Sequence, residues 1–163
     1  PFATVSFLAP DTSLELIEIG GLDDLYGFLD ANMPTANLMY VLRIDGTFEY
    51  VKTRSVPRQS NPYPPLTDIT AGQPVFEARG VQGTLVGFRF PQYMKGVNFP
   101  EYHLHFIASD RTFGGHVLEC SITEAKAQID AKSVFFMRLP RSESFFNADL
   151  GADKEQELIK AEK

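Results

Sequence analysis

The chain is poor in several residue types, and each shortage excludes a class of protein. Its 163 residues include one cysteine and no tryptophan. One cysteine cannot form an internal disulfide, which favours a reducing compartment such as the cytoplasm. No apolar run approaches the ~20 residues that a membrane-spanning helix needs. The sequence starts at Pro1 and not at a methionine, so a removed signal peptide stays open as an alternative.

Basic residues are also scarce and scattered. The chain has 15 Lys and Arg against 21 Asp and Glu, which gives a net charge of -6, and it contains no basic run. Nucleic acids and anionic membrane surfaces are therefore not expected as partners. With 44% hydrophobic and 22% charged residues, and with 14 Phe and 6 Tyr, the composition predicts a single domain over residues 1–163 with an aromatic-rich core.

Hydrophobic patterns along the chain predict an α+β domain with a mostly antiparallel or mixed β-sheet and two or three short helices. The apolar spacing from Leu22 to Leu29 predicts an amphipathic helix. The dipeptide Asp45-Gly46 predicts a tight hairpin turn. Strands are expected at 2–8, 38–44, 47–54, 80–90, 101–108, 116–120 and 133–139, further helices at 123–129 and 153–162, and loops at 55–73 and 91–100.

All three histidines of the chain lie between positions 103 and 116. His103 and His105 are two positions apart, so on a strand their rings project from the same face. A hairpin centred near Asp110-Arg111 would place His116 directly across from His105. Three imidazoles that converge without an obvious fourth protein ligand are the arrangement of an open catalytic Zn²⁺ site.

The same histidine pattern allows structural explanations. A histidine on an apolar strand is usually a core residue, and two at i and i+2 can both be surface residues of an edge strand. The position of every histidine of the chain on one predicted hairpin favours the metal site over these explanations. Cys120 shares the facing of His116 but lies ~13 Å further along the strand, too far for a Zn–S bond of ~2.3 Å.

The histidine segment is similar to a known signature. The run Pro100–Phe106, continued by Asp110–Leu118, resembles the zinc-binding signature of α-acetolactate decarboxylases. Three further segments resemble other parts of that family, namely Gly83–Arg89 with Pro91, Thr47–Arg54 with Pro57 and Gln59, and Glu157–Glu162. The resemblance spans the whole chain. It implies the larger C-terminal part of a longer family member, whose additional N-terminal portion contributes an active-site glutamate.

This resemblance implies zinc-dependent decarboxylation of 2-acetolactate, a 2-hydroxy-3-keto acid, to acetoin and carbon dioxide. The Zn²⁺ ligands that it implies are His103, His105 and His116. It makes Arg54 the arginine that points at the bound substrate, and Glu162 the proton donor, with Glu157 as the alternative if the register differs. Without the resemblance, an arginine at a strand end and the glutamates of a terminal helix would be read as solvated surface charges.

Other functions are compatible with three strand histidines. Carbonic-anhydrase-like and cupin-like enzymes also use such histidines, although their chemistry would not need Arg54. A binding domain stabilised by structural zinc usually provides four protein ligands, and this region offers three. The chain could also bind zinc and be inactive without the N-terminal portion. Exposed strand edges would in addition allow two copies to pair as a homodimer.

Overall fold

A computed structural model describes residues 3–60, 69 and 72–151 of the chain. Its elements are β1 (Thr12–Ile19), α1 (Leu22–Asn32), β2 (Met39–Arg54), β3 (Val75–Phe90), the 3₁₀ turn η1 (Gln92–Met94), β4 (Glu101–Ala108), β5 (Gly114–Lys132) and α3 (Glu143–Phe146). The strands pair antiparallel and outnumber the helices in this described part, as expected for an α+β protein. None of the described helices is both long enough and apolar enough to cross a membrane.

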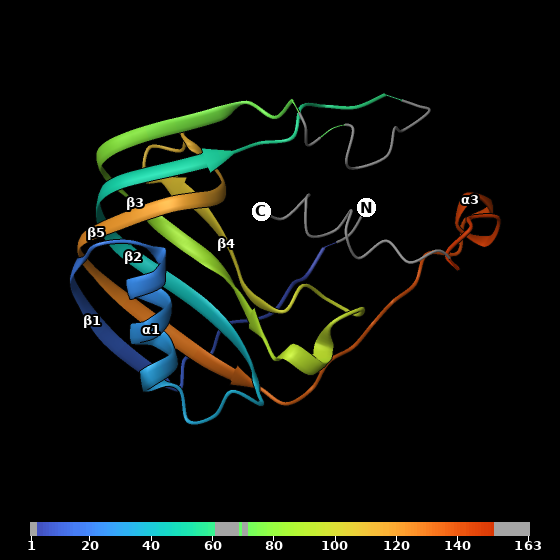
Figure 1. The fold of residues 1–163 in the computed structure, drawn as a ribbon, viewed down its shortest axis with the longest axis horizontal. Helices are drawn as coiled ribbons and strands as arrows, with labels where there is room; N and C mark the ends of the chain where they lie inside the picture. Colours follow the sequence, from blue (N-terminus) through green and yellow to red (C-terminus); the bar gives the residue numbers. More distant parts are fainter. Residues whose placement is uncertain (1–2, 61–68, 70–71, 152–163) are drawn as a thin grey trace.

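The five strands form one strongly curled sheet (Figure 1). Its strand order is β1-β5-β2-β3-β4, and β4 also pairs with the first residues of β5. The strands β2, β3, β4 and β5 therefore close on themselves at the end of the sheet where β5 begins. β5 has 19 residues, which is long enough to pair with β4 at its start and with β1 near its end. The closure brings together the last residue of β2, the middle of β4 and the start of β5.

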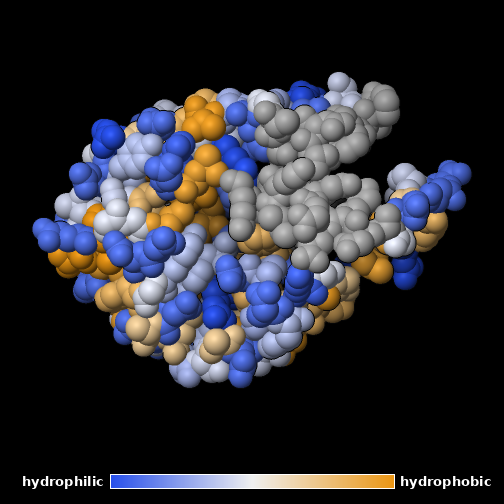
Figure 2. Space-filling model, in the orientation of Figure 1, coloured by the Kyte–Doolittle hydropathy of each residue, from blue (hydrophilic) through white to orange (hydrophobic). Residues whose placement is uncertain are grey.

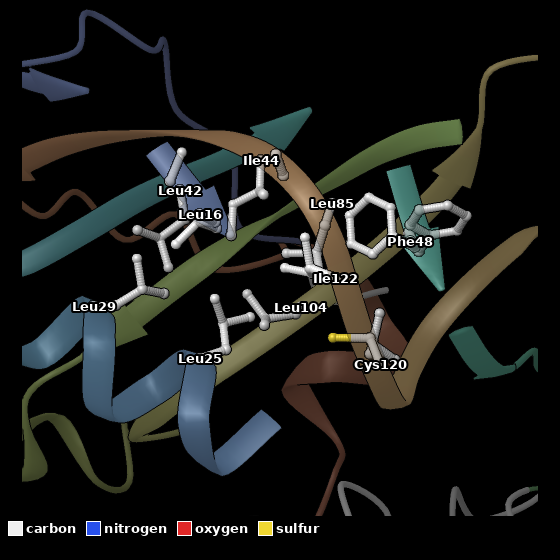
Figure 3. Close-up of a cluster of buried hydrophobic side chains, with 14 of the residues drawn as sticks. Leu16, Leu25, Leu29, Leu42, Ile44, Phe48, Leu85, Leu104, Cys120 and Ile122 are labelled. Carbon is white, nitrogen blue, oxygen red and sulfur yellow. The ribbon is translucent and has the colours of Figure 1, made fainter. Parts of the chain in front are cut away.

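The hydrophobic core lies between one face of this sheet and α1 (Figure 3). The predicted helix is confirmed, and its apolar stripe buries Leu25 and Leu29 completely. These side chains point at sheet residues such as Leu42, Leu104 and Ile122, which are also buried. Each fully buried leucine contributes roughly 1.5–3 kcal/mol of hydrophobic free energy, so this layer accounts for much of what holds α1 on the sheet.

The predicted hairpin at Asp45-Gly46 is wrong, because β2 runs without a turn from Met39 to Arg54. The glycine serves close packing and not a turn. A Cβ at Gly46 would lie 2.3 Å from the backbone oxygen of Glu124 on β5, so only glycine lets the two strands approach. The carboxylate of Asp45 is bound within the sheet, where it accepts hydrogen bonds from Arg43 and from the Thr84 hydroxyl on β3.

The helix predicted at 123–129 is also wrong, since this segment continues β5. Ala, Glu, Lys and Gln are all good helix formers, which is why the segment resembles a helix. The burial pattern nevertheless alternates along the strand, with Ala125, Ala127 and Ile129 inside. Pairing with β1 on one side and β2 on the other supplies backbone hydrogen bonds on both edges, so tertiary pairing overrides the local preference.

Three further expectations concern the ends of the chain. The described part of the strand expected at 2–8 has no regular structure, and the edge strand is instead β1, which pairs Leu14 with Ala127 and buries Leu16. The segment 133–139 also forms no strand, and its Phe136 is 84% exposed. The helix expected at 153–162 lies outside the described residues.

β3 begins earlier than expected, at Val75.

Candidate metal centre

The histidine hairpin has the expected form. His105 on β4 lies directly across from His116 on β5, and His103 shares the face of His105. The connecting turn is stabilised by Asp110, whose carboxylate accepts hydrogen bonds from the backbone and hydroxyl of Thr112 at 3.0 and 2.9 Å. The predicted juxtaposition of the three histidines is therefore confirmed as geometry.

The three imidazoles converge on one point. Their candidate ligand nitrogens all lie within 4.8 Å of one another. The Nε2 atoms of His103 and His105 are 3.1 Å apart, and the ring centroids of His103 and His116 are 4.8 Å apart. His105 is exposed and the other two rings are half-buried, so the cluster opens onto accessible space.

This donor set fits a tetrahedral cation with a free position. Two nitrogens that bind one Zn²⁺ at 2.0–2.1 Å in tetrahedral geometry are about 3.3 Å apart, close to the separation of His103 and His105. Within the described residues, no carboxylate or thiol belongs to this group. Cys120 does not belong to this group and is buried in the core, where burial raises the pKa of its thiol to about 12.

Arg54, the last residue of β2, lies opposite His116 in the ladder between β2 and β5. Gly115 permits this close approach. Its φ of +150° is strained for any other residue, and a Cβ there would lie 2.5 Å from the backbone oxygen of Arg54. The pairing register shifts between Lys52 and Thr53, because Leu118 is an extra residue on β5 just before this point. The fold thus brings Arg54 beside the histidine cluster.

A cavity of about 940 Å³ lies against this cluster and is lined by all three histidines and Arg54. The rest of its wall is mainly apolar. The apolar lining residues on the strands and just after β2 are Val41, Leu42, Val56, Val86, Phe88 and Phe90. Apolar side chains also form a band that runs into the middle of the face shown in Figure 2. The segment from Ala3 to Leu8 borders the cavity, where the side-chain amide of Asn98 donates a hydrogen bond to the Thr4 hydroxyl.

The opposite side of β4 is attached to α1 by two stacked tyrosines. The rings of Tyr26 on α1 and Tyr102 on β4 are parallel, with centroids 4.1 Å apart. The Tyr102 hydroxyl donates to Asp30 at 2.8 Å, and burial, together with this carboxylate, raises the pKa of Tyr102 well above its usual value. Because Tyr102 directly precedes His103, this contact holds the histidine strand against the helix.

The model of the alpha-acetolactate decarboxylase family matches residues 1–152 of the chain. The chain belongs to the alpha-acetolactate decarboxylase family. It is 50% identical over 163 residues to the alpha-acetolactate decarboxylase of Methanosarcina mazei, covering all of this chain and 57% of that protein. It is 42% identical over 149 residues to the enzyme of that name from Bacillus licheniformis, covering 91% of this chain and 59% of the relative. The chain thus spans little more than half the length of these decarboxylases.

The fold is likewise that of the acetolactate decarboxylase family. The crystal structure of alpha-acetolactate decarboxylase from Bacillus subtilis strain 168 superposes with a TM-score of 0.91 and 35% identity. The superposition covers 96% of this chain and 67% of that one. The curled sheet and its helix α1 therefore correspond to one part of the solved decarboxylase.

Two residues expected in the decarboxylase site, Glu162 and its alternative Glu157, lie outside the described residues, so their roles stay predictions. The apolar side chains that line the cavity carry no motif in the sequence. Val86 lies opposite His105, and Phe88 lies opposite His103, in the ladder between β3 and β4. The sequence predicted a strand at 80–90, but it did not predict that this strand pairs with the histidine strand.

Proposed function

We propose that this chain carries the metal centre for zinc-dependent decarboxylation of 2-acetolactate, a small 2-hydroxy-3-keto acid, to acetoin and carbon dioxide. The observation that carries the proposal is the convergence of three imidazoles beside Arg54 in one cavity. Membership of the family supports the choice of substrate. Because the chain spans 57% of the Methanosarcina relative, activity of this chain by itself is part of the proposal.

The reaction breaks the bond between the carboxylate carbon and C2 and leaves its electron pair on C2. This pair conjugates with the neighbouring ketone as an enediolate, and protonation of C2 then gives acetoin. A Zn²⁺ ion held by neutral His103, His105 and His116 would supply Lewis-acid stabilisation of that negative charge, worth several kcal/mol. The three histidines need only hold the ion and leave one side of it accessible, as their exposed arrangement allows.

Arg54 would bind the anionic end of the substrate. Its guanidinium keeps its positive charge at any physiological pH and offers planar pairs of N–H donors, which suit a carboxylate or the two oxygens of an enediolate. The position opposite His116 places this charge next to the histidine cluster. Because a guanidinium does not readily give up a proton, Arg54 would orient the substrate and stabilise its negative charge and would not act as the proton donor.

Protonation of C2 needs a general acid, and a carboxylic acid near the cation can serve. We assign this role to Glu162, with Glu157 as the alternative, on the resemblance of the C-terminal segment to that of the family. A glutamate from the additional N-terminal portion of the relatives would be the second carboxylic acid of the site.

The test is acetoin and carbon dioxide formation from 2-acetolactate, measured on the zinc-loaded chain and on the chelator-treated chain, with a protein-free blank. Each is assayed with and without a fragment that corresponds to the additional portion of the relatives. We expect about one zinc per chain and acetoin formation only when zinc is present. The proposal would be overturned if the chain bound stoichiometric zinc but formed no acetoin, either with or without the added fragment.

The same samples separate the competing functions. A carbonic-anhydrase-like centre would hydrate carbon dioxide, and it would keep that activity in Arg54→Ala. If this chain binds zinc but needs the additional portion of the relatives, acetoin would form only after that portion is added. A purely structural ion would leave both assays at the level of the blank, while its removal would lower the unfolding temperature.

A further inference from the structure

The histidine cluster has chemically different neighbours on its two sides. In the ladder between β2 and β5, His116 faces Arg54, a cation. In the ladder between β3 and β4, His105 faces Val86, an isopropyl group. Side chains opposed in this way have Cβ atoms about 5 Å apart, so both neighbours are within reach of a small molecule at the cluster.

The apolar side continues in the next row of the sheet. His103 faces Phe88 on β3, and Phe88 in turn faces Val41 on β2. Val86 and Phe88 are two positions apart and share one face of β3, and both line the cavity. Val86 in turn faces Arg43 on β2, which also lines the cavity but whose guanidinium is paired with Asp45 at 2.7 Å. The histidine cluster thus adjoins Arg54 on one side and the side chains of Val86 and Phe88 on the other.

We propose that Val86 and Phe88 form the wall that receives the alkyl groups of the substrate and limits their size. This inference rests on the proposed function for the identity of the substrate. A 2-hydroxy-3-keto acid has one charged end and one or two alkyl groups. Once its carboxylate lies towards Arg54 and its oxygens lie at the histidines, the alkyl groups are left on the side of β3. Neither valine nor phenylalanine can hydrogen-bond, so this wall discriminates by volume.

The first test compares 2-acetolactate with its 2-ethyl and 2-propyl homologues on the zinc-loaded protein. One methylene in an apolar pocket changes kcat/KM by roughly 10-fold to 200-fold. We expect Val86→Ala to shift the preference about 10-fold towards the longer chains, and Val86→Phe to shift it in the opposite direction. Val86 is 42% exposed, so both replacements are compatible with folding.

Ile107→Ala is the matched control. Ile107 is two positions beyond His105 on the same face of β4, is 46% exposed, and does not line the cavity among the described residues. The Ile107→Ala variant loses apolar surface on the same face of the sheet but leaves Val86 and Phe88 unchanged. Its preference among the three acids should therefore equal that of the unaltered chain.

A second readout does not depend on turnover. Calorimetry on the zinc-loaded protein compares two unreactive acids, 2-hydroxy-2-methylpropanoate and 2-ethyl-2-hydroxybutanoate. Val86→Ala should favour the larger acid and Val86→Phe the smaller. If binding shifts in this way while no homologue is decarboxylated, the wall stands and the proposed function fails. If acetoin forms but neither Val86 variant changes the preference in either assay, the wall is overturned and the proposed function stands.

Discussion

On one face of β4 the side chains of Leu104, Phe106 and Ala108 are buried in the core, whereas on the other face His103 and His105 open onto the cavity. Both sets belong to one strand of eight residues, and the twofold alternation of a β-strand keeps them apart. Core packing and the histidine cluster thus depend on the same strand but on opposite faces of it. Substitutions on the two faces should therefore have separable effects.

The largest effect is expected on the histidine face. His105→Ala should abolish stoichiometric zinc binding and acetoin formation, because two imidazoles alone hold the ion weakly. His105 is exposed, so the free energy of unfolding of the metal-free protein should change by less than about 1 kcal/mol. Metal analysis and urea unfolding measure the two quantities. Retention of one tightly bound zinc would contradict the assignment of His105.

The reverse result is expected on the core face. Leu104 is 2% exposed, and Leu104→Ala should lower the free energy of unfolding by about 2–5 kcal/mol through the cavity that it leaves. Zinc stoichiometry should be unchanged below the unfolding transition. Ile107→Ala, on the exposed face of the same strand, should cost only about 0.5 kcal/mol in the same urea titration. Loss of zinc in Leu104→Ala would show that the two faces are coupled.

Within the cavity, the next effect is expected at the arginine beside the histidines. Arg54→Ala should keep zinc but lower kcat/KM for acetolactate about 10²-fold to 10³-fold, the range found when one charge-stabilising donor is removed from an active site. Arg54→Lys should recover part of this loss, because an ammonium keeps the charge without the planar pair of donors. Arg79→Ala removes an exposed arginine that stacks over Tyr50 outside the cavity, and it should change turnover little.

The smallest effect concerns the contact between β4 and α1 and appears only at alkaline pH. Burial raises the pKa of Tyr26 to about 12, against about 10 in the unfolded chain. Its contribution to stability is therefore complete below about pH 10 and is lost as the pH rises towards about 12. Tyr26→Phe should flatten the fall of the unfolding free energy over this range, as measured by urea titrations at several pH values. An unchanged slope would mean that this ring does not titrate in the folded protein.

Much of the site could be predicted from local pattern. The spacing of His103 and His105, and the turn at Asp110-Arg111, were enough to place His116 across the hairpin, because a strand repeats every two residues and a short turn fixes the register. The apolar spacing from Leu22 to Leu29 was likewise enough for α1. The position of Arg54 beside the histidines followed from the family resemblance and not from any local pattern.

Local pattern failed where long-range pairing decides. Asp45-Gly46 has the composition of a turn, and 123–129 has that of a helix, yet both lie inside long strands that are paired on each side. The hydrogen bonds that decide these two segments come from residues far away in the sequence. The strong strand-forming residues of 133–139, by contrast, form no strand.

Sequence alone thus determined which side chains share a face and that three imidazoles meet, since both follow from the period of a strand over a few residues. Tertiary structure decided which strands are neighbours, and therefore that Arg54 adjoins the cluster on one side while Val86 and Phe88 adjoin it on the other. The physical reason is that strand pairing depends on the total burial and hydrogen bonding of the whole sheet, which no single segment encodes.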